Sequence, residues 1–281
     1  MRLQFQMIYY NNLTDNNLTI DMNEFAVVTG ASSGLGRCFA VELARRGINT
    51  ILVALPGSGV KDAALEAGSY GTDSIAFEAD LTDKKAILEV CTEIAGRYPV
   101  NILINNAGCG GTRKFLECDE EYIDRILGLN VMAVTTLTHQ LLPVLQQQNE
   151  AYILNVSSMA AFTPIGYKTV YPATKRFIYD FTRGLHEELN GSGISVSVIH
   201  PGPMKTNPDV TRRIERQGRF GRLGLLPPEK VARKGIDGMF KREAVIIPGL
   251  VNKLNKVLTD IVPARIRLPL VSRIVARELQ L

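Results

Sequence analysis

The chain has 281 residues, of which 46% are hydrophobic and 21% are charged. This composition excludes a wholly disordered or fibrous protein, and the length suits one large α/β domain. No segment approaches about 18 consecutive apolar residues, so no membrane-spanning helix is expected. The four cysteines form no C-x-x-C pair and the three histidines are scattered. We therefore expect no metal site, no disulfide framework and a reducing, cytoplasmic location.

The net charge of +4 is distributed unevenly along the chain. Residues 1–202 contain 15 Lys and Arg against 21 Asp and Glu, a net −6, whereas residues 203–281 contain 17 against 7, a net +10. The C-terminal part is expected either to meet an anionic substrate, lipid surface or protein, or to be a solvated basic face. No basic motif interleaved with aromatic residues is present, so nucleic acid is not an expected ligand.

Residues 1–21 are rich in asparagine and lack the features of a signal peptide. Met22 stands just before the first predicted strand. We expect residues 1–21 to be a disordered leader, or an extension that is not part of the native protein. Residues 22–249 are predicted to form a single domain and residues 250–281 a basic extension.

From Glu24 onward, short apolar segments alternate with segments of helical periodicity. Strands are predicted at residues 25–29, 50–54, 74–78, 100–104, 152–156 and 195–199. Helices are predicted at residues 35–46, 84–94, 122–146 and 171–189. Apolar strands separated by helices indicate a parallel sheet that is covered on both faces. Because βαβ crossovers are right-handed, the sheet is predicted to be doubly wound.

A glycine-rich turn follows the first strand at once and reads Gly30-Ala31-Ser32-Ser33-Gly34-Leu35-Gly36. Glycines in a strand-to-helix turn let the backbone bend tightly and approach a pyrophosphate at the helix N-terminus. The position of this G-x-x-x-G-x-G turn indicates a dinucleotide site in a Rossmann-type α/β fold. By itself, a turn with three glycines is also compatible with a purely structural role.

Four further elements follow in chain order: Asp80-Leu81, Asn105-Asn106-Ala107-Gly108, Ser158 with Tyr171-x-x-x-Lys175, and Pro201-Gly202 with Thr206. Together with the glycine-rich turn, this series resembles the classical short-chain dehydrogenase/reductase family over residues 24–206. The resemblance implies an enzyme that transfers a hydride between the nicotinamide of NAD(H) or NADP(H) and a carbonyl or secondary alcohol.

The candidate catalytic residues are Asn130, Ser158, Tyr171 and Lys175. Tyr171 and Lys175 share one helix face, and an adjacent ammonium is expected to lower the tyrosine pKa so that the hydroxyl exchanges a proton with a carbonyl oxygen. Ser158 is expected to position that carbonyl; it is preferred to Ser157 because its distance from Tyr171 resembles the family spacing. Asn130 matches the family's fourth catalytic residue, which helps a water relay protons through the lysine. The alternative interpretation of Asn130 is a structural one, in which this asparagine lies inside a helix and its side chain hydrogen-bonds to backbone groups.

The resemblance also implies a set of cofactor contacts. These are Gly30, Ser32, Ser33, Gly34, Leu35, Gly36, Asp80, Leu81, Asn106, Tyr171, Lys175, Pro201, Gly202, Met204 and Thr206. After the second strand, many relatives carry an Asp for the ribose hydroxyl of NAD or an Arg for the phosphate of NADP. Here Leu55 offers neither charge, and Arg37 and Lys61 are the nearest cations, so the sequence leaves NAD(H) and NADP(H) as equal alternatives.

Residues 203–228 are rich in Gly, Pro and Arg, and the equivalent segment of the family forms a lid over the substrate. Its arginines are Arg212, Arg213, Arg216, Arg219 and Arg222. Residues 250–281 alternate apolar and basic residues and are expected to be broken into short helices by Pro263 and Pro269. Such a segment either lies on an anionic membrane surface, at the inner face of the membrane, or packs on the core or a subunit interface.

This extension resembles those of family members that act on lipid-like ketones. We therefore predict a small-molecule substrate with a 3-oxo group, such as a 3-oxoacyl thioester, 3-ketosphinganine or a steroid. The alternatives are a sugar or xenobiotic carbonyl reductase, and a non-catalytic dinucleotide-binding redox sensor. The predicted helices at 122–146 and 171–189 resemble those that pair subunits in the family, which suggests a homo-oligomer.

Overall fold

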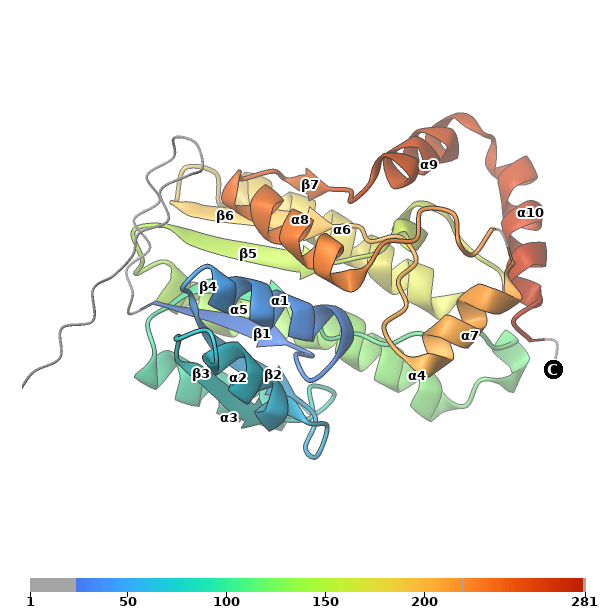
Figure 1. Cartoon of the computed structure of the whole chain (residues 1–281). Coiled ribbons are helices and arrows are strands. Elements are labelled where there is room, and N and C mark those ends of the chain that lie inside the picture. The colour runs from blue at the N-terminus through green and yellow to red at the C-terminus, as the bar shows by residue number, and fades with distance from the viewer. Residues whose placement is uncertain (1–23, 219, 280–281) are drawn as a thin grey trace, which may run out of the picture.

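The computed structural model describes residues 24–218 and 220–279, so the predicted leader and Arg219 lie outside the described residues. Its centre is a seven-stranded parallel sheet with the order β3-β2-β1-β4-β5-β6-β7 (Figure 1). The strands are β1 (Phe25–Thr29), β2 (Asn49–Ala54), β3 (Ser74–Glu78), β4 (Val100–Asn105), β5 (Ala151–Val156), β6 (Ile194–Ile199) and β7 (Val245–Ile246).

The strand order reverses beside β1, which pairs with β2 on one side and with β4 on the other. The chain therefore moves outward in one direction as far as β3 and then in the other as far as β7. Such a reversal opens a crevice beyond the carboxyl ends of the two central strands, where ligands of this class of sheet bind. All residues of β1, β2, β4, β5 and β6 are buried, as expected for strands covered on both faces.

Helices cover both faces of the sheet. One core contains residues of α1 (Gly34–Arg45), α2 (Val60–Gly68) and α8 (Pro228–Phe240), and the opposite core contains residues of α3 (Lys84–Arg97) and α5 (Ala133–Leu145). The remaining helices are α4 (Glu120–Leu127), α6 (Val170–Glu188), α7 (Pro208–Arg216), α9 (Leu250–Ile261) and α10 (Ala264–Ala276), with the short turns η1 (Phe115–Glu117), η2 (Gly128–Met132) and η3 (Met159–Phe162).

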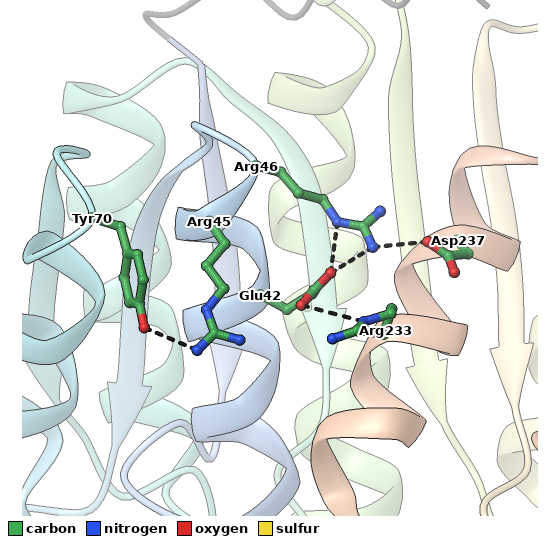
Figure 2. Close-up of polar contacts among 6 residues, drawn as sticks. All are labelled: Glu42, Arg45, Arg46, Tyr70, Arg233 and Asp237. Atoms are coloured by element: carbon green, nitrogen blue, oxygen red, sulfur yellow. Dashed lines mark hydrogen bonds and ion pairs between the residues drawn. The ribbon is translucent and has the colours of Figure 1, made fainter. Parts of the chain in front are cut away.

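A network of polar contacts fixes α1 against its two neighbours (Figure 2). Arg46, at the end of α1, donates to Glu42 at 2.6 Å and to Asp237 of α8 at 2.8 Å. On the other side, Arg45 donates to the hydroxyl of Tyr70 at 3.0 Å, just after α2. These partly exposed contacts contribute little individually. Together they hold the C-terminal end of α1, the end away from the glycine-rich turn.

The predicted doubly wound sheet with helices on both faces is confirmed, and the six predicted strands agree within one residue at each end. The predicted helix at 122–146 is interrupted by η2, a π turn. The prediction that Pro269 breaks the C-terminal extension is wrong, because Pro269 lies inside α10. Only Pro263 separates α9 from α10, since the residue before a proline avoids the helical conformation.

Helices α7 and α10 lie at the end of the molecule toward which the strands of the sheet point (Figure 1). The basic extension therefore stands beside the crevice end of the sheet. No helix within residues 24–218 and 220–279 is long and apolar enough to cross a membrane.

Candidate active site

The glycine-rich turn has a backbone that only glycines permit. Gly30 and Gly34 have φ of +65° and +55°, a left-handed conformation that other residues rarely adopt. A Cβ on Gly36 would lie 2.2 Å from the carbonyl oxygen of Gly30. The side chain of Ser33, the N-cap of α1, makes no capping hydrogen bond, which leaves the first N–H groups of the helix for an anion. The turn therefore fits the pyrophosphate of a dinucleotide.

The turn is joined rigidly to the loop after β4. Asn106 donates its side-chain amide to the carbonyl oxygens of Thr29 at 2.8 Å and Gly30 at 3.3 Å. In return, the hydroxyl of Thr29 accepts the N–H groups of Asn106 and Ala107, both at 3.0 Å. Asn106 was predicted as a cofactor contact. In the structure its amide nitrogen holds the backbone of the glycine-rich turn against the loop after β4. Thr29 was not singled out, although a hydroxyl at the end of the first strand was a usable signal.

The other predicted cofactor residues lie around the same crevice. Thr206, in the loop after β6, lies against the turn, because a Cβ on Gly34 would be 3.2 Å from the Cβ of Thr206. Asp80 is exposed after β3 and accepts from the backbone and hydroxyl of Thr82 at 2.9 and 2.8 Å, while Leu81 is buried. Gly202 packs tightly on Asn252 of α9, whose Oδ1 would be 2.5 Å from an added Cβ.

The segment after β2 has no unpaired charge that would select the cofactor. Arg37 forms an ion pair with Glu66 at 2.5 Å, and Lys61 forms one with Glu78 at 3.2 Å. Glu78 also accepts the N–H of Gly57, and this hydrogen bond is the main reason that its pKa is lowered. Each cation that the sequence offered for a 2′-phosphate is thus balanced by a carboxylate.

The catalytic candidates meet at the carboxyl ends of β4 and β5. Tyr171 lies in the first turn of α6, and the amine of Lys175 lies 5.9 Å from the centroid of its ring. Lys175 is buried and donates to the carbonyl oxygen of Val156 at 2.9 Å. A Cβ on Gly108 would meet Asn130 at 3.0 Å and Lys175 at 3.2 Å, so both side chains lie against the same stretch of backbone.

Asn130 is buried within the π turn η2. Its Oδ1 accepts the N–H of Cys109 at 2.9 Å, and its Nδ2 donates to the carbonyl oxygen of Cys109 at 2.9 Å and to the hydroxyl of Thr174 at 3.0 Å. Single π turns inside helices are frequent at functional sites. Thr174 was missed by the sequence analysis, although its place beside Lys175 on α6 was a signal.

The two neighbouring serines have different surroundings. Ser157 is buried, and its hydroxyl donates to the carbonyl oxygen of Lys175 at 2.7 Å. Ser158 is half-buried, and its hydroxyl accepts the N–H of Ala160 at 3.1 Å while facing Tyr171, whose pKa it acts to lower. Nδ1 of His200 lies 3.0 Å from the carbonyl oxygen of Ser158, and burial lowers the pKa of this histidine to about 4. A neutral His200 thus donates to the backbone that carries Ser158.

The predicted lowering of the tyrosine pKa by Lys175 is wrong. Burial raises the pKa of Tyr171 above its usual value, and the hydrogen bond from Ser158 and the positive charge of Arg213 act in the opposite direction. The amine of Lys175 is directed to the Val156 carbonyl, and burial lowers its own pKa to about 8. Tyr171 therefore holds its proton firmly at neutral pH.

Residues 24–217 match the family model of the short chain dehydrogenase. The chain belongs to the short-chain dehydrogenase family. The solved structure of a short-chain dehydrogenase from Sphingobium yanoikuyae in complex with NADPH superposes with a TM-score of 0.72 at 29% identity, over 85% of this chain and 96% of that one. The predicted resemblance to the short-chain dehydrogenase/reductase family is thereby confirmed.

Two curated relatives match at a similar level. The probable oxidoreductase EphD of Mycobacterium tuberculosis is 29% identical over 234 residues, which is 78% of this chain and 40% of EphD. The very-long-chain 3-oxoacyl-CoA reductase of Anas platyrhynchos is 31% identical over 185 residues, which is 64% of this chain and 59% of that reductase. The chain thus spans about half the length of these two short-chain dehydrogenase relatives.

Proposed function

We propose that this short-chain dehydrogenase reduces a 3-oxo group on a lipid-like substrate, with a 3-oxoacyl thioester as the first candidate. The observation that carries the proposal is the convergence of Tyr171, Ser158, Lys175 and Asn130 beside a turn that fits a dinucleotide. The glycine-rich turn and Thr206 would hold the cofactor. When bound, the nicotinamide supplies the hydride.

The proton for the reduced oxygen comes from the hydroxyl of Tyr171. Burial raises the pKa of this phenol, so it is fully protonated at neutral pH and suits the direction of carbonyl reduction. Ser158 orients the substrate carbonyl toward Tyr171, because its hydroxyl is within hydrogen-bonding reach of the phenol. His200 fixes the backbone of Ser158 and thereby the direction of that hydroxyl.

Lys175 and Asn130 replace the proton that Tyr171 gives up. The amine of Lys175 has a pKa of about 8, near neutrality, so it can both release and regain a proton. Asn130 holds the Cys109 backbone and Thr174 in place beside this amine. Because the Lys175 amine is directed to the Val156 carbonyl and lies 5.9 Å from the Tyr171 ring centroid, a proton would pass from Lys175 to Tyr171 through a water.

We assign the apolar part of the substrate to a cavity of about 230 Å³ between α10 and the segment that leads into α6. Its lining is Pro164, Ile165, Gly166, Thr169, Leu268 and Ser272. The first four residues precede α6, and the last two belong to α10. The hydroxyl of Ser272 accepts the N–H of Gly166 at 2.9 Å, which fixes α10 against the loop that leads to Tyr171. The similarity to a very-long-chain 3-oxoacyl-CoA reductase supports the same substrate class.

We further infer that α9 contacts an anionic membrane surface, from which an apolar substrate would be taken. Leu250, Leu254, Leu258 and Ile261 recur at helical spacing and are all exposed, Leu250 by 85% and Ile261 by 70%. The inner side of α9 is fixed by Asn252, which donates to the carbonyl oxygens of Gly224 and Pro248 at 3.0 and 2.8 Å. An apolar outer stripe flanked by Lys253 and Lys256 suits the boundary between headgroups and acyl chains.

The membrane proposal is tested with vesicles of phosphatidylglycerol and phosphatidylcholine. We expect the Leu254→Glu, Leu258→Glu double variant to sediment with anionic vesicles less than the unchanged protein does. The control is Leu65→Glu, which adds a charge at a residue of α2 that is 75% exposed. Equal sedimentation of all three proteins would contradict the proposal.

A second copy of the chain is the partner we propose for the exposed apolar residues Leu127, Met132 and Phe177 on α4, η2 and α6. Light scattering of the purified protein measures the mass. A strictly monomeric protein at micromolar concentration would rule this out.

The catalytic proposal is tested by adding a 3-oxoacyl thioester to protein that has first been titrated with NADH and with NADPH. We expect loss of the reduced-cofactor absorbance with one of them, and a loss of at least 100-fold in kcat for Tyr171→Phe with cofactor binding unchanged. Tyr70→Phe is the matched control, since the hydroxyl of this tyrosine accepts from Arg45 of α1, at the end of the helix away from the glycine-rich turn. Equal turnover of Tyr171→Phe and the unchanged protein would refute the assignment.

A further inference from the structure

A second cavity, of about 270 Å³, lies between α7 and the end of the C-terminal extension. Its lining is Thr112, Asp209, Arg212, Arg213, Arg216 and Glu278. Three segments that are far apart in the sequence build it: the loop after β4, the lid helix α7 and the end of the C-terminal extension. Three of the six lining side chains are arginines from a single helix.

The charges of this cavity do not cancel. Arg212 is paired with Asp209, and Arg216 donates to the backbone carbonyl oxygen of Glu278 at 3.1 Å. The carboxylate of Glu278 is fully buried and is already used by Lys168 at 2.9 Å and by Thr112 and Gln217. The cavity and its salt-bridge partner contain four basic side chains and two acidic ones, a net charge of +2. The basic residues are Lys168, Arg212, Arg213 and Arg216, and the acidic ones are Asp209 and Glu278.

Arg213 is the cavity arginine whose guanidinium has no partner within the described part of the chain. It is half-buried, so it has lost part of its hydration without gaining a carboxylate. A guanidinium presents a planar fork of donors that matches the oxygens of a carboxylate or a phosphate. Arg213 is thus poised for an oxyanion from outside the chain.

The cavity borders the catalytic site through one short stretch of backbone. Gly110 lies against the ring of Tyr171, since an added Cβ would be 2.6 Å from it. Gly111 lies against Tyr122, and the next residue, Thr112, already lines the cavity. Two residues span at most about 7 Å. Burial raises the pKa of Tyr171 and of Tyr122, and the positive charge of Arg213 partly offsets that rise at both phenols.

We propose that this cavity binds an oxyanion carried by the substrate, and that Arg213 is the residue that selects it. The proposal rests on the proposed function and narrows it: an anionic ketone is favoured over a neutral steroid and over a cationic 3-ketosphinganine. The oxyanion is either a carboxylate near the reacting carbon or a phosphate of the thioester's carrier group. Both sources share the chemistry that a guanidinium recognises.

The experiment compares three substrates with the same 3-oxoacyl chain. They are the coenzyme A thioester, the neutral N-acetylcysteamine thioester, and an N-acetylcysteamine thioester whose chain ends in a carboxylate. We expect one of the anionic substrates to have a kcat/KM about 10-fold to 100-fold above that of the neutral one, the ratio expected of a charge-assisted hydrogen bond. The preferred anion identifies the source as phosphate or carboxylate.

The deciding variant is Arg213→Gln, which should remove the preference through a higher KM for the anionic substrate alone. Arg213→Lys should keep part of the preference. The control is Arg97→Gln, which should keep all of it, because this arginine is exposed on α3, pairs with Glu93 and does not line the cavity. The proposal is overturned if Arg213→Gln leaves the ratio unchanged. It is equally overturned if the variant slows all three substrates alike with a shifted pH profile, because Arg213 would then serve Tyr171 only.

A binding measurement separates this proposal from the proposed function. If none of the thioesters is reduced, the protein is melted with dodecanoate or pyrophosphate and, as the neutral probe, dodecanol. Stabilisation by either anion that is lost in Arg213→Gln supports the oxyanion site even where the 3-oxo substrate is wrong. Equal shifts for the unchanged protein and the variant, or no shift with either anion, overturn it.

Discussion

The buried amine of Lys175 predicts that Lys175→Met makes the protein more stable while removing its activity. Burial lowers the pKa from 10.5 to about 8, and this shift corresponds to about 3 kcal/mol of unfavourable free energy at neutral pH. Methionine forgoes the hydrogen bond to the Val156 carbonyl, which is worth about 1 kcal/mol. The variant should therefore be more stable by about 2 kcal/mol at pH 7.

The pH dependence of this difference follows from the sign of the shift. Below pH 8, Lys175 is protonated in both states, and the folded state bears the full cost of burying the charge. Between about pH 8 and pH 10.5, the folded protein releases a proton that the unfolded chain still holds, so its stability rises relative to that of the variant. Above pH 10.5 the amine is neutral in both the folded and the unfolded state. The cost of burying its charge is then absent, so Lys175→Met loses the gain in stability that this cost gave it.

The assay is urea unfolding of the cofactor-free protein at pH 7, 8, 9 and 10, followed by circular dichroism. The control is Arg176→Met, because this arginine is exposed on the same helix, where it pairs with Asp180 and lies 5.1 Å from the centroid of the Tyr179 ring. It should change the free energy of unfolding by no more than about 0.5 kcal/mol. The reasoning is refuted if Lys175→Met is the less stable protein at pH 7, or if its advantage is the same at pH 7 and pH 10.

Three further outcomes are expected. Gly36→Ala should weaken NADPH binding at least 10-fold in a fluorescence titration, because the added Cβ would lie 2.2 Å from a carbonyl oxygen. The control Gly96→Ala should bind NADPH normally, because its Cβ would meet nothing within 4 Å. Equal affinities of the two variants would contradict the assignment of the glycine-rich turn as the cofactor site. Ser158→Ala should lower kcat and also lose about 1 kcal/mol of stability, because its hydroxyl accepts the N–H of Ala160 at 3.1 Å. Ser157→Ala should lose about 1 kcal/mol of stability but keep its kcat, and a fall in kcat for Ser157→Ala alone would exchange their roles. Glu278→Gln should cost about 3 kcal/mol in urea unfolding, since it leaves a buried lysine without its counter-charge; a cost below about 1 kcal/mol would show that water replaces the carboxylate.

The strands could be predicted because residues buried on both faces of a parallel sheet form continuous apolar runs, as in FAVVT at β1. Helix α2 was not predicted, although its sequence VKDAALEAG has helical composition, because it follows a turn rich in glycine. Strand β7 has only two residues and therefore no periodicity to detect. Helix α8 was also not predicted, although it buries Val231, Ile236 and Met239 in the core, because it follows a segment rich in Gly, Pro and Arg that was assigned as a loop.

For the site, motif spacing was enough to select Asn130, Ser158, Tyr171 and Lys175, which the fold brings together; their catalytic roles stay a prediction. The direction of the Tyr171 pKa was missed because spacing along a helix does not say where an amine points. The contact of Glu278 with the loop after β4 and with α7 was equally out of reach. It depends on where the C-terminal extension docks, and no local pattern encodes that.

The π turn at Gly128–Met132 makes the length of this helical segment a functional property. A π turn holds one residue more than an α turn, and successive α-helical residues are rotated by about 100°. Deleting one residue there would restore regular pitch but would rotate α5 against α4, withdrawing either Asn130 from Cys109 or the buried face of α5 from the core. Loops of this fold can change in length between relatives, whereas this helical segment cannot do so without losing either its asparagine or its packing.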